Sequence, residues 1–156
     1  MTSEFNSPYN ITITNDSPVV SYSPYRDGPS VTGWNLTCAG SLDSAWFRPS
    51  FCIGPSSHRS SFVGGTLTIN FEGTAIYLYG SATSGSYTIS IDGQINPSFA
   101  SDASSGLLGA GVEMPFGKHS LVLSITQSST VSFSQAILTV EVGRGDRFGL
   151  TSQSAI

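Results

Sequence analysis

The chain has 156 residues and a formal net charge of −4, and only 10% of its residues are charged. That length suits a single domain with its own core. Its six basic residues are scattered, which excludes the cationic face that nucleic acid needs and the polybasic segment that binds anionic membranes, and no apolar run is long enough to predict a transmembrane helix.

Apolar and polar residues alternate with period 2 along most of the chain, which predicts strands and no helix. The predicted strands lie, in chain order, at 9–14, 18–23, 66–73, 74–80, 86–93, 118–126, 131–133 and 136–142. Val131 and Phe133 have the opposite parity to Leu138 and Val140. This mismatch predicts a bulge or bend near 134–136.

Turn residues between these runs predict antiparallel neighbours, with Asp92-Gly93 as the clearest example. Residues 23–60 break the pattern and are rich in Pro, Gly and Ser, which predicts a long functional loop. The fold class is therefore an all-β, antiparallel jelly-roll β-sandwich. We expect one domain over 9–142, an N-terminal extension or expression remnant at 1–8, and a flexible tail or linker at 143–156.

Four segments resemble a group of fungal cell-surface proteins, namely the extracellular jelly-roll domains of single-pass proteins. They are "ITITNDSPVVSYSP", "GTLTINFEGTAIYLYGS", "YTISIDGQ" and "PFGKHSLVLSIT". The resemblance covers about Tyr9 to Val142. It implies a galactose-binding-domain-like sandwich, a fold that mostly binds glycans. In full-length members of the group, a Ser/Thr-rich linker and a membrane helix usually follow this domain. It supplies no catalytic residues, and the loop over 23–60 matches in position only.

Both cysteines bracket one segment, "CAGSLDSAWFRPSFC" from Cys38 to Cys52. A disulfide is favoured, with two buried thiols as the alternative. A zinc site would need further ligands, and the only histidines, His58 and His119, do not fit a familiar spacing.

Three N-x-[ST] sequons predict glycosylation, at Asn10, Asn15 and Asn35. Together with the paired cysteines they indicate a secreted glycoprotein, located outside the cell or at its surface.

Carbohydrate sites place flat aromatic faces against the C–H faces of sugars, with polar groups beside them. The loop over 23–60 carries such residues, and the predicted ligand-binding set is Tyr25, Arg26, Asp27, Trp34, Asp43, Trp46, Arg48, His58 and Arg59. Any of the aromatics could instead pack over the end of the sandwich. We expect no cofactor; calcium held by Asp16, Asp27 and Asp43 is the alternative.

The predicted function is a non-catalytic glycan-binding domain, whose partner is a cell-wall polysaccharide or oligosaccharide. One alternative is a structural or adhesive module that binds protein or itself. Another is a small glycan-active enzyme, for which Glu72, Asp92 and Glu113 are candidates by residue type only. We expect no catalytic residues, and we attribute the "RGD" at 144–146 to chance.

Overall fold

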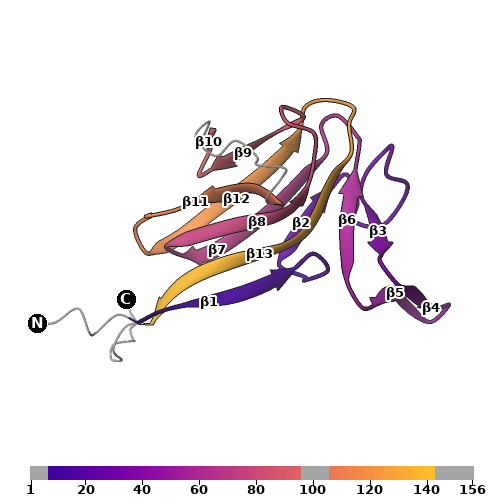
Figure 1. Cartoon of the computed structure of the whole chain (residues 1–156), viewed down its shortest axis with the longest axis horizontal. Coiled ribbons are helices and arrows are strands. Elements are labelled where there is room, and N and C mark those ends of the chain that lie inside the picture. Colours follow the sequence, from indigo (N-terminus) through magenta and orange to yellow (C-terminus); the bar gives the residue numbers. More distant parts are fainter. Residues whose placement is uncertain (1–6, 96–105, 143–156) are drawn as a thin grey trace, which may run out of the picture.

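The computed structural model describes residues 7–95 and 106–142 (Figure 1). All regular elements in these two segments are β-strands, and every strand pair is antiparallel. The all-β prediction is confirmed. In this part of the chain no helix could cross a membrane. Residues 1–6 of the predicted extension, and the predicted tail with its "RGD", lie outside the described residues.

Two sheets pack face to face around one core. The first has the order β11 (Leu107–Gly111), β8 (Ala75–Ser81), β13 (Val131–Val142), β6 (Ser56–Ser60), β3 (Asn35–Cys38), and β1 (Ser7–Thr14) also pairs with β13. The second has the order β10 (Gln94–Ile95), β9 (Tyr87–Ile91), β12 (Gly117–Ile125), β7 (Thr66–Gly73), β2 (Val20–Ser23). A separate hairpin joins β4 (Ser41–Ala45) to β5 (Arg48–Ile53). The predicted β-sandwich is confirmed.

The inward faces of the strands are those that the alternation predicted. Leu67 and Leu121 come from the second sheet, Ile76 and Leu138 from the first, and all four are buried in the same cluster. The register between β13 and β8 shifts between Phe133 and Gln135, as expected for a bulge. The predicted bulge is therefore confirmed, and it lets both halves of β13 point into the core.

The prediction of one long loop over 23–60 is wrong, because β3, β4, β5 and β6 all lie within it. The pattern missed them for a physical reason: the buried positions of β6 are polar, His58 and Ser60, so no hydrophobic alternation marks the strand. Strands β10 and β11 were also missed. The first has two residues, and the second is the Gly-rich "LLGAG", which has low β propensity.

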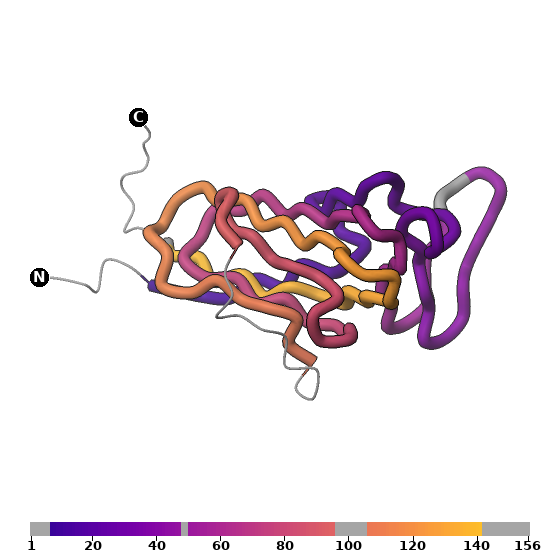
Figure 2. The backbone as a smooth tube through the Cα atoms, turned by 90° about the horizontal axis from the view of Figure 1, so that it is seen from above, coloured from indigo at the N-terminus to yellow at the C-terminus, as the bar shows by residue number. Residues whose placement is uncertain are grey.

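The two described ends of the chain lie together, because Ser7 at the start of β1 pairs with Val142 at the end of β13. The β4–β5 hairpin lies at the opposite end of the sandwich (Figure 1). Figure 2 shows that this region projects beyond the two sheets. The hairpin is thus the most distal part of the domain.

Candidate functional site

A disulfide joins Cys38 to Cys52, which confirms the favoured of the three alternatives. Cys38 ends β3 and Cys52 lies in β5, so the bond ties the hairpin to the edge of the first sheet. Such a crosslink reduces the conformational freedom that the hairpin would otherwise lose on binding a ligand. The hairpin is therefore held in place although it adds little to the core.

The tip of the hairpin is aromatic and exposed. Ala45 pairs with Arg48, which leaves Trp46 and Phe47 as the turn between them. The Trp46 side chain is 96% exposed, and its ring meets that of Phe47 edge-on at 5.7 Å. Nothing in the core needs this indole, so it presents a large apolar face to solvent.

A cleft of about 450 Å³ lies between the hairpin and the end of the sandwich. This volume is within the usual range of small-molecule sites. Its lining residues are Asp16, Pro18, Arg26, Asp27, Leu36, Ser50, Phe51 and His58. The cleft therefore brings together three of the predicted ligand residues, which are Arg26, Asp27 and His58.

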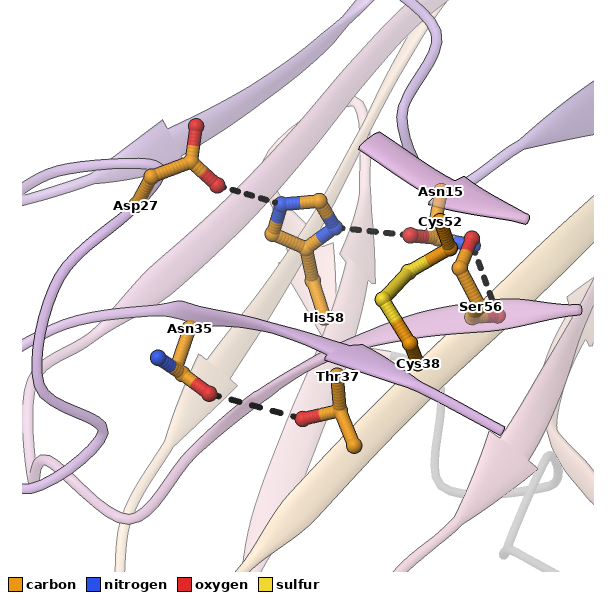
Figure 3. Close-up of a disulfide and its surroundings, with 8 residues drawn as sticks. All are labelled: Asn15, Asp27, Asn35, Thr37, Cys38, Cys52, Ser56 and His58. Atoms are coloured by element: carbon orange, nitrogen blue, oxygen red, sulfur yellow. Dashed lines mark hydrogen bonds and ion pairs between the residues drawn. A yellow bond between two sulfur atoms is a disulfide. The ribbon is translucent and has the colours of Figure 1, made fainter. Parts of the chain in front are cut away.

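His58 forms the floor of the cleft and is 1% exposed. Its ring stacks on Tyr22 of the other sheet, with centroids 4.5 Å apart. Nδ1 lies 2.7 Å from Asn15 Oδ1 and Nε2 lies 3.0 Å from Asp27 Oδ1, on opposite sides of the ring (Figure 3). Burial lowers the pKa of His58, and the hydrogen bond to Asp27 opposes that effect.

Arg26 occupies one wall of the cleft. Its guanidinium lies 5.4 Å above the Tyr22 ring and donates to the carbonyl of Val20 at 3.2 Å. Its Nε is 3.9 Å from Asp27 Oδ2. The closest partners of the Arg26 charge are therefore a backbone carbonyl and an aromatic face. Burial raises the pKa of the Tyr22 hydroxyl, so this group stays neutral.

Trp34 is fully buried and has no surface to offer a ligand, so its predicted place in the ligand-binding set is wrong. The side chain is 0% exposed, its Nε1 donates to the Ser23 carbonyl at 3.2 Å, and its ring packs on Tyr22 at 5.1 Å. The loop that carries Trp34 folds over the end of the sandwich, and the indole closes the core there. The alternative that one tryptophan caps the sandwich applies to Trp34.

The structure also contradicts glycosylation of Asn15. This side chain is buried, and its Nδ2 donates to the carbonyls of Ser56 at 2.9 Å and Ser134 at 3.0 Å. A glycan on Nδ2 would displace these bonds and could not be accommodated in the core. Asn10 is exposed and Asn35 is half-buried, and both sites stay predictions.

Tyr25 is half-buried and shapes the loop that carries Arg26 and Asp27. Its ring lies between Gly28 and Gly33, where an added Cβ would come within 2.3 Å and 2.5 Å of it. Its hydroxyl donates to the Pro29 carbonyl at 2.6 Å. Tyr25 thus positions the neighbouring polar residues, and only glycine fits on either side of its ring.

The remaining predicted residues lie around the cleft. Asp43 pairs across the hairpin with Phe51, so the two share a face, and the Arg48 backbone pairs with Ala45. Arg59 follows His58 in β6 and is exposed, so it points to the opposite face of the strand from His58. The predicted roles of Asp43 and Arg48 stay predictions, while Arg59 is turned away from the cleft.

A second hollow of about 540 Å³ lies over β7 and β12, beside the turn that joins β9 to β10. Glu72 and Asp92 both line it, whereas Glu113 is not among its lining residues. His119 Nδ1 is 2.7 Å from Asp92 Oδ2 and its Nε2 is 2.8 Å from the Pro115 carbonyl. Both partners only accept, so hydrogen on both ring nitrogens would satisfy them, which favours the imidazolium form.

This pair predicts a pH dependence of stability. The hydrogen bond to Asp92 raises the pKa of His119, and the bond from His119 lowers the pKa of Asp92. His119 therefore stabilises the fold at acidic and neutral pH, and this contribution is lost as pH rises through its raised pKa. We expect Tm, measured by circular dichroism, to fall by a few degrees between about pH 6.5 and pH 9. His119→Gln should remove this slope, and an unchanged slope would contradict the assignment.

Within residues 7–95 and 106–142, no group of three or more His, Cys, Asp or Glu side chains is arranged to hold a metal ion. Asp16 and Asp27 line the same cleft, and Asp43 lies on the hairpin.

The comparisons with known proteins give a fold but no family. No family model matches the chain, and no curated protein does. A family two carbohydrate esterase from Cellvibrio japonicus has a similar structure, with a TM-score of 0.54 and 12% sequence identity. The likeness shows the fold alone. It covers 90% of this chain and 37% of the esterase chain, so the chain spans about a third of that protein.

Sequence reasoning missed several cleft residues, including Asn15 as the partner of His58 and the apolar wall of Leu36 and Phe51. The sequence offers one clue to Phe51, because this residue lies inside the segment that the cysteines bracket. It offers no clue to a buried role for Asn15, since the N-x-[ST] sequon there predicts an exposed, glycosylated side chain.

Proposed function

We propose that this chain is a non-catalytic, extracellular module that binds glycans through the β4–β5 hairpin and the cleft beside it. The observation that carries the proposal is Trp46, which is 96% exposed on a hairpin that a disulfide holds in place. An indole face of this kind can stack on the C–H face of a sugar ring, while Asp27 and other polar groups of the cleft bind its hydroxyls. The architecture that the chain shares with a carbohydrate esterase supports a carbohydrate-related function, although an esterase weakly favours the enzyme alternative over a binding module.

Trp46→Ala is expected to weaken glycan binding at least tenfold, which is about 1.4 kcal/mol, because the stacking surface is removed. A glycan array with cell-wall polysaccharides identifies the ligand, and calorimetry with the soluble ligand, with and without calcium, measures the affinity. Phe116→Ala is the matched control, since Phe116 is another exposed aromatic residue, remote from the hairpin in the chain. This variant should bind the glycan with unchanged affinity. Absence of binding to every glycan, with calcium present, would refute the proposal.

Two observations support a non-catalytic role. Both ring nitrogens of His58 and of His119 contact protein atoms, so neither ring offers a free general base. Asp92 accepts from His119 and from the Ser120 amide, which favours its ionised form. The enzyme alternative depends on Glu72 and Asp92 in the second hollow. If the chain hydrolyses acetylated or plain polysaccharides and Asp92→Asn abolishes this hydrolysis, the enzyme alternative is favoured.

Self-association is the second candidate, and the apolar surface of the hairpin favours it. Leu42, Phe47 and Ile53 are exposed there together with Trp46. Apolar patches of this kind occur where proteins associate. Sedimentation velocity at increasing protein concentration would reveal a mass that rises, and the same analysis of Trp46→Ala would show whether the hairpin causes it.

A further inference from the structure

The first sheet has an open edge at β1. Among the described residues, β1 pairs with β13 along one side, and no strand pairs with its other side. The register with β13 is unbroken from Ser7 to Thr14, so β1 has no bulge, and it carries no charged residue. Natural proteins protect edge strands with bulges, charges or proline, and of these β1 has only Pro8, near its start. The rest of the edge is open to another strand.

One hydrogen bond shows which backbone groups of β1 point to the open side. The amide of Asn15 donates to the Ser134 carbonyl at 3.0 Å, in continuation of the register between β1 and β13. Bonded and outward-pointing residues alternate in an antiparallel ladder, so the odd-numbered residues of β1 bond to β13. The N–H and C=O groups of Asn10 and Thr12 therefore point away from β13.

Both ends of this outward row lack one of their two backbone groups. Pro8 has no N–H to donate, and the Thr14 carbonyl already accepts from the Ser17 amide at 3.0 Å. A second, antiparallel copy of β1 centred on Ile11 would set Pro8 of one copy opposite Thr14 of the other. The missing donor then meets the engaged acceptor, so this register leaves neither group with a lost bond.

The same register matches the groups between these ends. Asn10 of one copy lies opposite Thr12 of the other, and each such pair can exchange both N–H···O bonds. The Asn10 side chain accepts from Thr139 of β13 at 2.8 Å, so it does not occupy the open edge. The outward row of β1 is therefore complementary to itself.

The side chains fit this pairing as well. Ile11 would face Ile11 of the second copy in a pair without hydrogen bonds, where side chains approach most closely. Tyr9 would face Ile13 of the second copy. Tyr9 and Ile11 are exposed, as is Val19, which lines a groove of about 360 Å³ beside the strand. Because β1 has no charge, nothing in the strand repels its own copy.

We propose that two copies of this chain associate through β1 as an antiparallel, two-fold dimer centred on Ile11, in which the first sheet continues from one copy into the other. The occupant of the edge is a second copy because the two-fold register is the one that sets Pro8 against the engaged carbonyl of Thr14. In each copy β1 runs toward the hairpin end (Figure 1), so the two hairpins lie at opposite ends of the dimer. The dimer does not depend on glycan binding; if the proposed function also holds, it joins two glycan chains.

Sedimentation velocity of the full chain, from about 10 μM to about 1 mM, measures the association. We expect the mass to rise from 16.3 kDa toward twice that value. Thr12→Pro removes an outward N–H and leaves the bonds to β13 in place, so the dimer should weaken at least tenfold. Thr12→Val keeps the N–H and is the matched control, which should associate like the parent chain. Circular dichroism checks that each variant is folded.

Charges placed at the two-fold axis test the register. Ile11→Lys and Ile11→Glu each set like charges opposite one another, so each variant alone should stay monomeric. An equimolar mixture should associate again, because opposite charges then meet, and a variant that had merely unfolded would not be rescued by mixing. Trp46→Ala should leave the dimer intact, which distinguishes it from association through the hairpin.

Several results would overturn the inference. They are a mass that stays at 16.3 kDa over the whole range, a Thr12→Pro variant that associates like the parent chain, and a mixture of the two Ile11 variants that stays monomeric. Loss of association in Trp46→Ala would assign the interface to the hairpin and overturn it too. Glycan binding by a monomeric chain would leave the proposed function intact, whereas a dimer that binds no glycan would refute that function alone.

Discussion

Replacing Trp34 by alanine is expected to lower the free energy of unfolding by about 3–5 kcal/mol, the usual cost of removing a buried tryptophan. The indole is fully buried, packs against Tyr22 and donates to the Ser23 carbonyl. Its loss leaves a cavity where the loop over 24–34 covers the core. Because that loop carries Arg26 and Asp27, the cleft should be distorted as well. Urea denaturation followed by far-ultraviolet circular dichroism measures the cost.

Trp46→Ala is the matched control, because it removes the same side chain from the surface. Its effect on stability should stay within about 0.5 kcal/mol, as for most exposed positions. Trp34→Phe keeps an aromatic ring but removes the hydrogen bond to Ser23, so we expect an intermediate loss. Similar losses for the two alanine variants would contradict the assignment of one tryptophan to the core and the other to the solvent.

The sandwich could be predicted from the sequence because its core strands obey the period of a half-buried strand. Leu67 and Ile69 on β7 alternate with polar residues and are buried. Leu121 and Leu123 on β12 are also buried, on the opposite face of the strand from the half-buried Val122 between them. The Asp92-Gly93 turn was equally readable: φ is positive at both residues, and they join Ile91 to Gln94 in a two-residue hairpin. These signals are local, so the sequence contains them in full.

The candidate site was only partly predictable, because its geometry depends on contacts between distant residues. Asn15 and Asp27 lie 43 and 31 residues from His58, and no local pattern links them. Nothing in the sequence distinguishes the buried tryptophan from the exposed one. Their burial differs because Trp34 precedes β3, close to the core, whereas Trp46 forms the tip of a hairpin outside the two sheets.

Asn15 connects the fold to the site through the bulge in β13. The register shift leaves Ser134 without a partner position on β8, and the Ser134 carbonyl accepts hydrogen bonds from both the backbone and the side chain of Asn15. The same side chain reaches His58, whereas the backbone carbonyl of Asn15 accepts from the Tyr22 hydroxyl. Asn15 therefore links both sheets through its side chain and its backbone together, and its Oδ1 keeps a hydrogen on His58 Nδ1.

Asn15→Ala is expected to cost about 3–5 kcal/mol, because it removes the side-chain partner of the Ser56 carbonyl and of the His58 Nδ1 hydrogen. The Ser134 carbonyl loses one of its two bonds and keeps the one from the backbone of residue 15. It should also favour the neutral His58 tautomer with hydrogen on Nε2, because Nδ1 loses its acceptor while Nε2 keeps the contact with Asp27. Urea denaturation measures the first effect. Imidazole ¹⁵N resonances measure the second, as a gain of the Nε2–H form.

Asn70→Ala provides the control for stability, since Asn70 is an exposed asparagine on β7, and its loss should cost less than about 0.5 kcal/mol. The second effect is measured on the folded variant, so it is independent of the loss of stability. A folded Asn15→Ala variant whose His58 ring keeps its hydrogen on Nδ1 would show that Asn15 does not control the protonation of the cleft floor.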